Sequence, residues 1–152
     1  MNPANATDTF IKEITVKAPA ERVFEALANP VERVKWWGVE GRFQVTHMES
    51  DLRPGGSWWM SGTRMGGKVF TIRGEYRAID RPRFLEFTWL PDWQEPETLV
   101  RFDLTEKDGT TKVRLTHSGL TREHLEKYQG WPRLLVLLQA YVEAKVAGVV
   151  CG

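Results

Sequence analysis

The chain has 152 residues, and its 21 Lys and Arg nearly balance its 20 Asp and Glu. This balance gives no electrostatic basis for binding nucleic acid or an acidic membrane surface. No apolar run approaches the roughly 18 residues of a transmembrane helix, and the N-terminus lacks the basic and apolar regions of a secretory signal. The single cysteine, Cys151, excludes an internal disulfide, which fits a reducing compartment. We therefore expect one cytoplasmic domain over residues 1–152, with its core at about 9–146.

The N-terminal part predicts one strand followed by two short helices. Residues 9–18 alternate between apolar and polar side chains, as in a half-buried strand. Pro19 suits the first turn of a helix over 20–28, where its missing N–H costs nothing. Asn29-Pro30 ends that helix and begins another over 30–37, because the residue before proline avoids the α region.

The middle of the chain predicts six further strands. Each alternates apolar with polar residues, and glycine-rich or proline-containing turns separate them. Gly74 interrupts one of these strands, which indicates a bend or a close backbone approach. Asp108-Gly109 is typical of a tight hairpin. The six strands are expected at 42–49, 57–64, 69–79, 84–89, 100–105 and 112–117.

A last helix is predicted from Trp131 to about residue 146, with an apolar stripe at helical spacing. A short helix capped by Thr121 could precede it. The element order is therefore β-α-α-β6-α. Alternating strands are typical of an antiparallel sheet with one covered face, and the last helix is available to cover it. This predicts an α+β helix-grip fold, in which a curved sheet wraps around a long C-terminal helix.

Several ordered segments carry a family resemblance over about residues 9–146. They are the Pro-x-Glu-x-Val-Phe-x-Ala-Leu opening from Pro19, Trp36-Trp37-Gly38, Pro54-Gly55-Gly56, Phe87-Thr88-Trp89, the Asp-Gly-Thr hairpin, Leu115-Thr116-His117-Ser118-Gly119 and Gly130-Trp131. The chain resembles the family named after activators of the heat-shock protein 90 ATPase, in the START-related, birch-pollen-allergen-like (SRPBCC) superfamily. The resemblance implies a helix-grip fold with a hydrophobic cavity. It leaves function open, since relatives include ligand carriers, polyketide cyclases, resistance proteins and chaperone-associated domains.

A ligand pocket is expected between the inward face of the sheet and the last helix. Seven tryptophans are many for one core, so some are expected to line a cavity or its rim. Each apolar residue taken singly is also explained by ordinary core packing. The candidate ligand-binding residues are Trp36, Trp37, Trp58, Met60, Phe70, Tyr76, Phe87, Trp89, Phe102, His117, Leu135, Leu138 and Tyr141.

His117 is a candidate for a catalytic role, because an imidazole on the inward face could move a proton near neutral pH, and a tyrosine could do so in its place. A histidine satisfied by neighbouring groups is the more common case. His47 also falls on a face that the alternation places inward. No spacing of histidine or cysteine indicates a metal site, and no phosphate-binding loop or other cofactor motif is present.

Three functions remain open from the sequence. The first is binding of a hydrophobic or aromatic small molecule in the cavity, with one or two hydrogen bonds for orientation. The second is a cyclase or aldol-type enzyme that folds a flexible substrate in the same pocket. The third is a protein-interaction domain that binds a chaperone, which is not favoured because no additional N-terminal segment is seen. A homodimer is compatible with each.

Overall fold

The computed structural model describes residues 8–39, 42–92, 97–121 and 131–146. Within these ranges the helices are α1 (Ala20–Ala28), α2 (Pro30–Trp36) and α4 (Trp131–Val146). The strands are β1 (Asp8–Val16), β2 (Gly38–Val39), β3 (Phe43–Ser50), β4 (Ser57–Arg64), β5 (Val69–Asp80), β6 (Phe84–Pro91), β7 (Thr98–Lys107) and β8 (Thr110–Leu120). The predicted short helix after Thr121 and the single cysteine, Cys151, lie outside the described residues.

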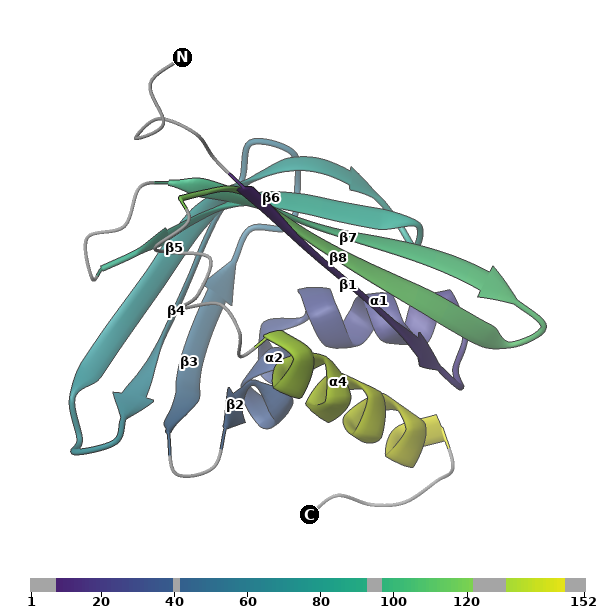
Figure 1. Cartoon of the computed structure of the whole chain (residues 1–152), viewed down its shortest axis with the longest axis horizontal. Coiled ribbons are helices and arrows are strands. Elements are labelled where there is room, and N and C mark those ends of the chain that lie inside the picture. The colour runs from purple at the N-terminus through teal and green to yellow at the C-terminus, as the bar shows by residue number, and fades with distance from the viewer. Residues whose placement is uncertain (1–7, 40–41, 93–96, 122–130, 147–152) are drawn as a thin grey trace.

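The strands form one antiparallel sheet in the order β1-β8-β7-β6-β5-β4-β3-β2. Every strand after β2 pairs with the next in sequence, and β1 closes the other end by pairing with β8. Figure 1 shows the sheet curling over α1, α2 and α4, which lie on its concave side. The predicted α+β helix-grip fold is therefore confirmed, and the strand and helix limits agree with the predicted ones within three residues.

The break between α1 and α2 follows the predicted chemistry. The side chain of Asn29 accepts a hydrogen bond from the backbone N–H of Val31 at 2.9 Å, and Pro30 occupies the first turn of α2. At the start of α1, Pro19 is the N-cap and offers no side-chain acceptor. The carboxylate of Glu106 on β7 accepts from Ala20 N–H instead, at 2.7 Å. A side chain distant in sequence therefore completes the helix end.

The inward placement of His47 is wrong. The pairing of β3 with β4 shifts register between Val45 and His47, so the extra residue changes which face the following side chains occupy. As a result Met48 is buried, whereas the His47 side chain is 54% exposed and lies against Trp59. A second difference is β2, a strand of two residues that the sequence pattern does not predict.

Gly74 is a close backbone approach, as its interruption of β5 indicates. A Cβ added there would lie 1.9 Å from the carbonyl oxygen of Thr88 on β6. The Asp108-Gly109 turn joins β7 to β8, with φ angles of 54° and 77°. Positive φ at both central residues is what a tight two-residue hairpin requires.

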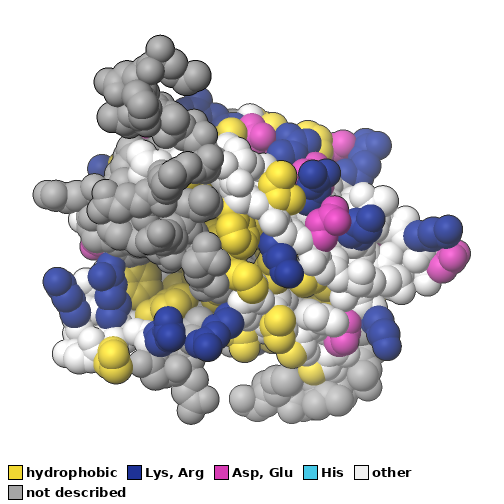
Figure 2. Space-filling model, in the orientation of Figure 1, with side chains coloured by type: hydrophobic (Ala, Val, Ile, Leu, Met, Phe, Trp, Pro, Cys, Tyr) yellow, Lys and Arg dark blue, Asp and Glu magenta, His cyan; other side chains and the backbone are white. Residues whose placement is uncertain are grey.

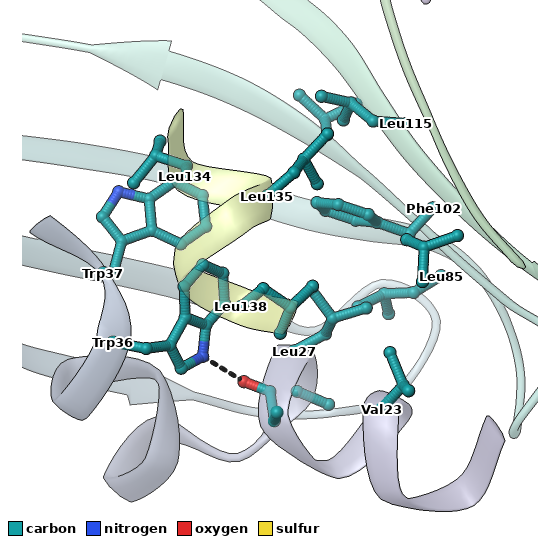
Figure 3. Close-up of a cluster of buried hydrophobic side chains, with 14 of the residues drawn as sticks. Val23, Leu27, Trp36, Trp37, Leu85, Phe102, Leu115, Leu134, Leu135 and Leu138 are labelled. Carbon is teal, nitrogen blue, oxygen red and sulfur yellow. Dashed lines mark hydrogen bonds between the residues drawn. The ribbon is translucent and has the colours of Figure 1, made fainter. Parts of the chain in front are cut away.

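The core lies between the concave face of the sheet and the helices. Figure 3 shows Leu135 and Leu138 of α4 converging with Leu27 of α1 on Leu85 and Phe102 of the sheet. Each of these side chains is buried. The predicted helical stripe of α4 therefore faces the sheet, and the first residue of that helix brings an indole into the same interior.

Candidate functional site: an aromatic interior

The candidate ligand-binding residues come together in the interior. All thirteen have at most 8% of their surface exposed. Burial alone does not distinguish a packed core from the wall of a binding site. The contacts between these side chains and the hydrogen bonds of their polar groups distinguish the two cases.

Tryptophan rings form a continuous cluster between the sheet and the helices. Trp37, which follows α2, lies 5.1 Å from Trp36, 6.0 Å from Trp89 and 5.4 Å from Trp131, measured between ring centroids. Trp89 lies 5.9 Å from Trp58, which extends the cluster to β4. These separations are those of interacting aromatic pairs. The cluster thus connects the second helix, the middle of the sheet and the start of α4.

His117 is buried within this cluster, and both of its ring nitrogens are hydrogen-bonded. Nδ1 accepts from the indole Nε1–H of Trp131 at 3.1 Å, and Nε2 lies 2.7 Å from Oγ1 of Thr98. Since an indole nitrogen only donates, the imidazole is neutral, with its proton on Nε2. Burial lowers the pKa of His117 to about 3. A neutral ring that is bonded at both nitrogens is suited to holding α4 against β8, whereas a general base needs a free nitrogen.

The hydroxyls of the two candidate tyrosines are also hydrogen-bonded. The hydroxyl of Tyr76 lies 2.6 Å from Oγ of Ser50, and burial raises the pKa of Tyr76. The hydroxyl of Tyr141 donates to Glu32 at 3.0 Å, and Glu32 also pairs with Arg22. Burial and the adjacent Glu32 carboxylate raise the pKa of Tyr141 to about 12. Tyr141 therefore links α4 to α1 and α2, while Tyr76 faces the aromatic interior.

Arg33 is the residue that the sequence analysis missed. It lies on α2 and is only 1% exposed, which is rare for an arginine without an acidic partner. Its guanidinium carbon is 4.3 Å from the ring centroid of Trp37, 5.5 Å from Phe87 and 5.7 Å from Trp58. The available signal was its spacing, because Arg33 precedes Trp36 and Trp37 by one helical turn and so shares their face.

The polar groups of Arg33 are only partly satisfied. Nη1 donates to the carbonyl oxygen of Leu27 at 3.2 Å, whereas Nε and Nη2 have no hydrogen-bond partner. The indole Nε1 of Trp58 is likewise buried without a partner. Burial lowers the pKa of Arg33 to about 10, so the group remains a cation at neutral pH. Among the described residues, the interior thus holds a positive charge and three N–H donor atoms without a hydrogen-bond partner.

A surface groove of about 640 Å³ lies elsewhere, beside the start of α1 and the turn between β5 and β6. It contains none of the thirteen candidate residues. Each acidic side chain that lines it has a partner: Glu106 caps Ala20, Asp80 pairs with Arg83 at 2.8 Å, and Asp103 pairs with Arg101 at 3.0 Å. We therefore place the candidate site in the aromatic interior.

Two further properties concern the described part of the chain. It contains no group of three or more His, Cys, Asp or Glu side chains arranged to hold a metal ion. None of its helices is long and apolar enough to cross a membrane.

Solved structures share this fold at low sequence identity. Protein NE0264 from Nitrosomonas europaea is 18% identical, with a TM-score of 0.79 over 91% of this chain and 96% of that one. CalU16 from Micromonospora echinospora is 23% identical, with a TM-score of 0.67 over 97% and 84%. DynU16, a protein of the dynemicin biosynthetic locus, is 22% identical, with a TM-score of 0.73 over 91% and 48%. These likenesses establish the fold alone.

Sequence comparison identifies the family. No curated protein matches the chain significantly. The sequence profile described as "Activator of Hsp90 ATPase homolog 1-like protein" matches residues 17–143, which span every described element from α1 through most of α4. The chain therefore belongs to the family of Activator of Hsp90 ATPase homolog 1-like proteins.

Proposed function

We propose that this protein binds a hydrophobic or aromatic small molecule in the interior between the sheet and α4. The observation that carries the proposal is the continuous tryptophan cluster in which the Nε1–H of Trp58 has no partner. Small-ligand sites combine apolar and aromatic walls with a few polar groups that orient the ligand. A fully satisfied core would be expected to leave no such donor unused.

The energetic basis of binding would be burial of apolar ligand surface against the rings, with hydrogen bonds for orientation. Burial contributes roughly 25 cal/mol for each Å² of apolar surface removed from water. Binding energy for very small ligands is limited to about 1.5 kcal/mol per non-hydrogen atom, so a small apolar compound should bind modestly. The described interior is closely packed, so a ligand of this kind would displace side chains as it enters.

A cyclase or aldol-type enzyme acting in the same interior is the second candidate. The observation that favours it is the buried Tyr76 hydroxyl, whose pKa is raised by burial and lowered in part by the charge of Arg33. A buried proton donor whose pKa a nearby cation lowers is a useful group for stabilising an enolate. DynU16, a structural neighbour, comes from a biosynthetic locus, which supports small-molecule chemistry for that protein. Under this proposal Tyr76 replaces His117 as the proton-transfer group.

A chaperone-associated role rests on the family description, and a homodimer is compatible with every alternative. The lone cysteine in the sequence supports a cytoplasmic location. The small-molecule proposal is preferred to these, because it alone accounts for the aromatic interior and its unpartnered donors.

Native mass spectrometry of the protein purified under mild conditions tests the proposal. A mass increment that disappears after denaturation would identify a co-purified small molecule, and the same spectrum reports whether the protein is a monomer or a dimer. The apo protein would then be titrated with a panel of aromatic and aliphatic compounds while tryptophan emission is recorded. Absence of both an increment and any saturable response would overturn the proposal and make the chaperone-associated role the leading one.

A further inference from the structure

The unpaired donors of Arg33 indicate the chemical class of the ligand. We infer that the interior recognises a carboxylate, held by the Nε–H and Nη2–H of Arg33. The ligand would thus be an aromatic or aliphatic carboxylic acid. This inference rests on the proposed small-molecule function and deepens it.

The geometry of the guanidinium supports a carboxylate in particular. Nη1 is the nitrogen already used, since it donates to Leu27 O on α1. Nε and Nη2 lie on the other edge of the planar group, where their N–H bonds point in parallel. This edge is the fork that binds the two oxygens of a carboxylate bidentately. The backbone contact therefore leaves free the pair of donors best suited to such a ligand.

The charge of Arg33 has no counterion within the described residues. None of their Asp or Glu side chains forms an ion pair with it, although ten other ion pairs are present in the same structure. The faces of Trp37, Phe87 and Trp58 offset part of the cost through cation–π attraction. They supply no hydrogen-bond acceptor for Nε or Nη2. An anionic ligand would supply both the acceptor and the missing charge.

Trp58 borders the guanidinium and carries a further unpartnered donor. Its ring centroid is 5.7 Å from the guanidinium carbon, and its Nε1 is buried without a partner. Buried indole N–H groups usually find a partner. The unpartnered indole is therefore a second sign that the described interior lacks a polar partner.

The surroundings of Arg33 add a requirement on how such a ligand enters. Because Arg33 is only 1% exposed, a carboxylate reaches it only when the neighbouring rings move. Figure 2 shows hydrophobic side chains gathered near the middle of the face on which α4 lies, with Lys and Arg side chains beside them. An amphipathic anion would meet both apolar and positively charged side chains on this face.

The inference is tested with matched probes that differ only in the head group. 2-Naphthoate is compared with 2-naphthalenemethanol, and dodecanoate with dodecanol, by tryptophan fluorescence titration at constant ionic strength. We expect the acid of at least one pair to bind about tenfold or more tightly than the alcohol. In Arg33→Gln this preference should fall to about twofold or less, while the alcohol binds as before. Arg114→Gln, whose side chain is half exposed on β8, is the matched control and should retain the preference.

The outcomes separate the inference from the proposed function. If an alcohol binds and its acid does not, or if Arg33→Gln keeps the full preference for the acid, the carboxylate inference fails and small-molecule binding stands. If no probe of either pair binds and no molecule co-purifies, the proposed function fails. NMR of the wild-type protein avoids dependence on a variant that folds poorly. The acid should shift the Arg33 Nε–H and Trp58 Nε1–H signals, and an unshifted Arg33 signal at saturation would overturn the inference.

Discussion

The indole Nε1–H of Trp131 donates a hydrogen bond to Nδ1 of His117 across 3.1 Å, which joins the first residue of α4 to the middle of β8. This bond fixes the neutral tautomer of the imidazole, whose Nε2–H is directed at Thr98. Protonation of Nδ1 would break the contact and place a charge among the rings of Trp89 and Trp131. The protonation state of His117 therefore makes the packing of α4 against the sheet depend on pH.

Stability should fall as the pH is lowered through this histidine's range. The pKa of His117 is about 3 in the folded protein, against roughly 6.5 for an ordinary histidine. Between these values the unfolded chain binds a proton that the folded chain does not. The free energy of unfolding should therefore decrease by about 1.4 kcal/mol per pH unit from this residue, with no contribution above about pH 7.

Urea unfolding at pH 7, 6, 5 and 4 measures that slope, and the His117→Gln variant should show a smaller one. His47→Gln, at an exposed histidine, is the control and should keep the wild-type slope. NMR of the imidazole provides a direct check, because His117 should not titrate between pH 8 and 5. Titration in that interval would contradict the assigned environment.

Leu138→Ala should destabilise the protein by about 2–5 kcal/mol, because Leu138 is fully buried among the core side chains of α1, α2 and the sheet. A smaller loss would indicate that the residue borders open space, where truncation creates no new cavity. Val136→Ala on the same helix is the control, since Val136 is 58% exposed and should change stability by less than about 0.5 kcal/mol. The midpoint of urea unfolding distinguishes these results.

The fold and the inward face were predictable from sequence because both follow from local periodicity. Alternation over β4 to β8 places most of the apolar side chains on one face, and the eight candidate residues on these strands are buried accordingly. The exception, His47, follows a register shift in β3. One extra residue there moves the side chains that follow to the opposite face of the sheet. The apolar and polar pattern of the sequence does not reveal this shift.

The state of the site could not be predicted in the same way. Arginine is normally a surface residue, so its residue type did not predict that Arg33 is buried, although it shares a face with Trp36 and Trp37. Whether its donors are paired depends on Leu27, Trp58 and Phe87, which come from three different elements. The same holds for His117, whose role depends on Trp131. Such pairings are properties of the assembled interior.

Gly74→Ala should destabilise by more than about 3 kcal/mol, because the new methyl group would lie 1.9 Å from Thr88 O and 2.7 Å from Trp58 Nε1. To relieve this overlap, the backbone of β6 would have to move away from β5. Gly66→Ala serves as the comparison, since nothing lies within 4 Å of its added Cβ and only the positive φ of 89° penalises it, by about 1–2 kcal/mol. Equal losses in thermal or urea unfolding would show that the two strands are farther apart than described.

Ligand binding should be reported most strongly by the tryptophans of the cluster. We expect Trp36, Trp37, Trp58 and Trp89 to respond, because all four are buried around the proposed site. Trp59 is 36% exposed and points away from the interior, so Trp59→Phe should leave the ligand-induced change in emission intact. Single Trp→Phe variants titrated with a ligand from the panel measure each contribution. A response that is lost only in Trp59→Phe would place binding on the outer face of the sheet.

Arg33→Met should leave the protein as stable as the wild type or make it more stable, although the residue is buried. Truncation of a buried group normally costs stability, but Met keeps most of the volume and removes a desolvated charge with two unpaired nitrogens. The lost bond to Leu27 O and the lost cation–π contact with Trp37 oppose this gain by about 1–2 kcal/mol. A residue kept for binding at a cost in stability shows this behaviour.

Arg33→Ala should be less stable than Arg33→Met because it leaves a cavity. Urea unfolding of both variants decides the matter: a loss above about 3 kcal/mol in Arg33→Met would make Arg33 a structural residue of the core.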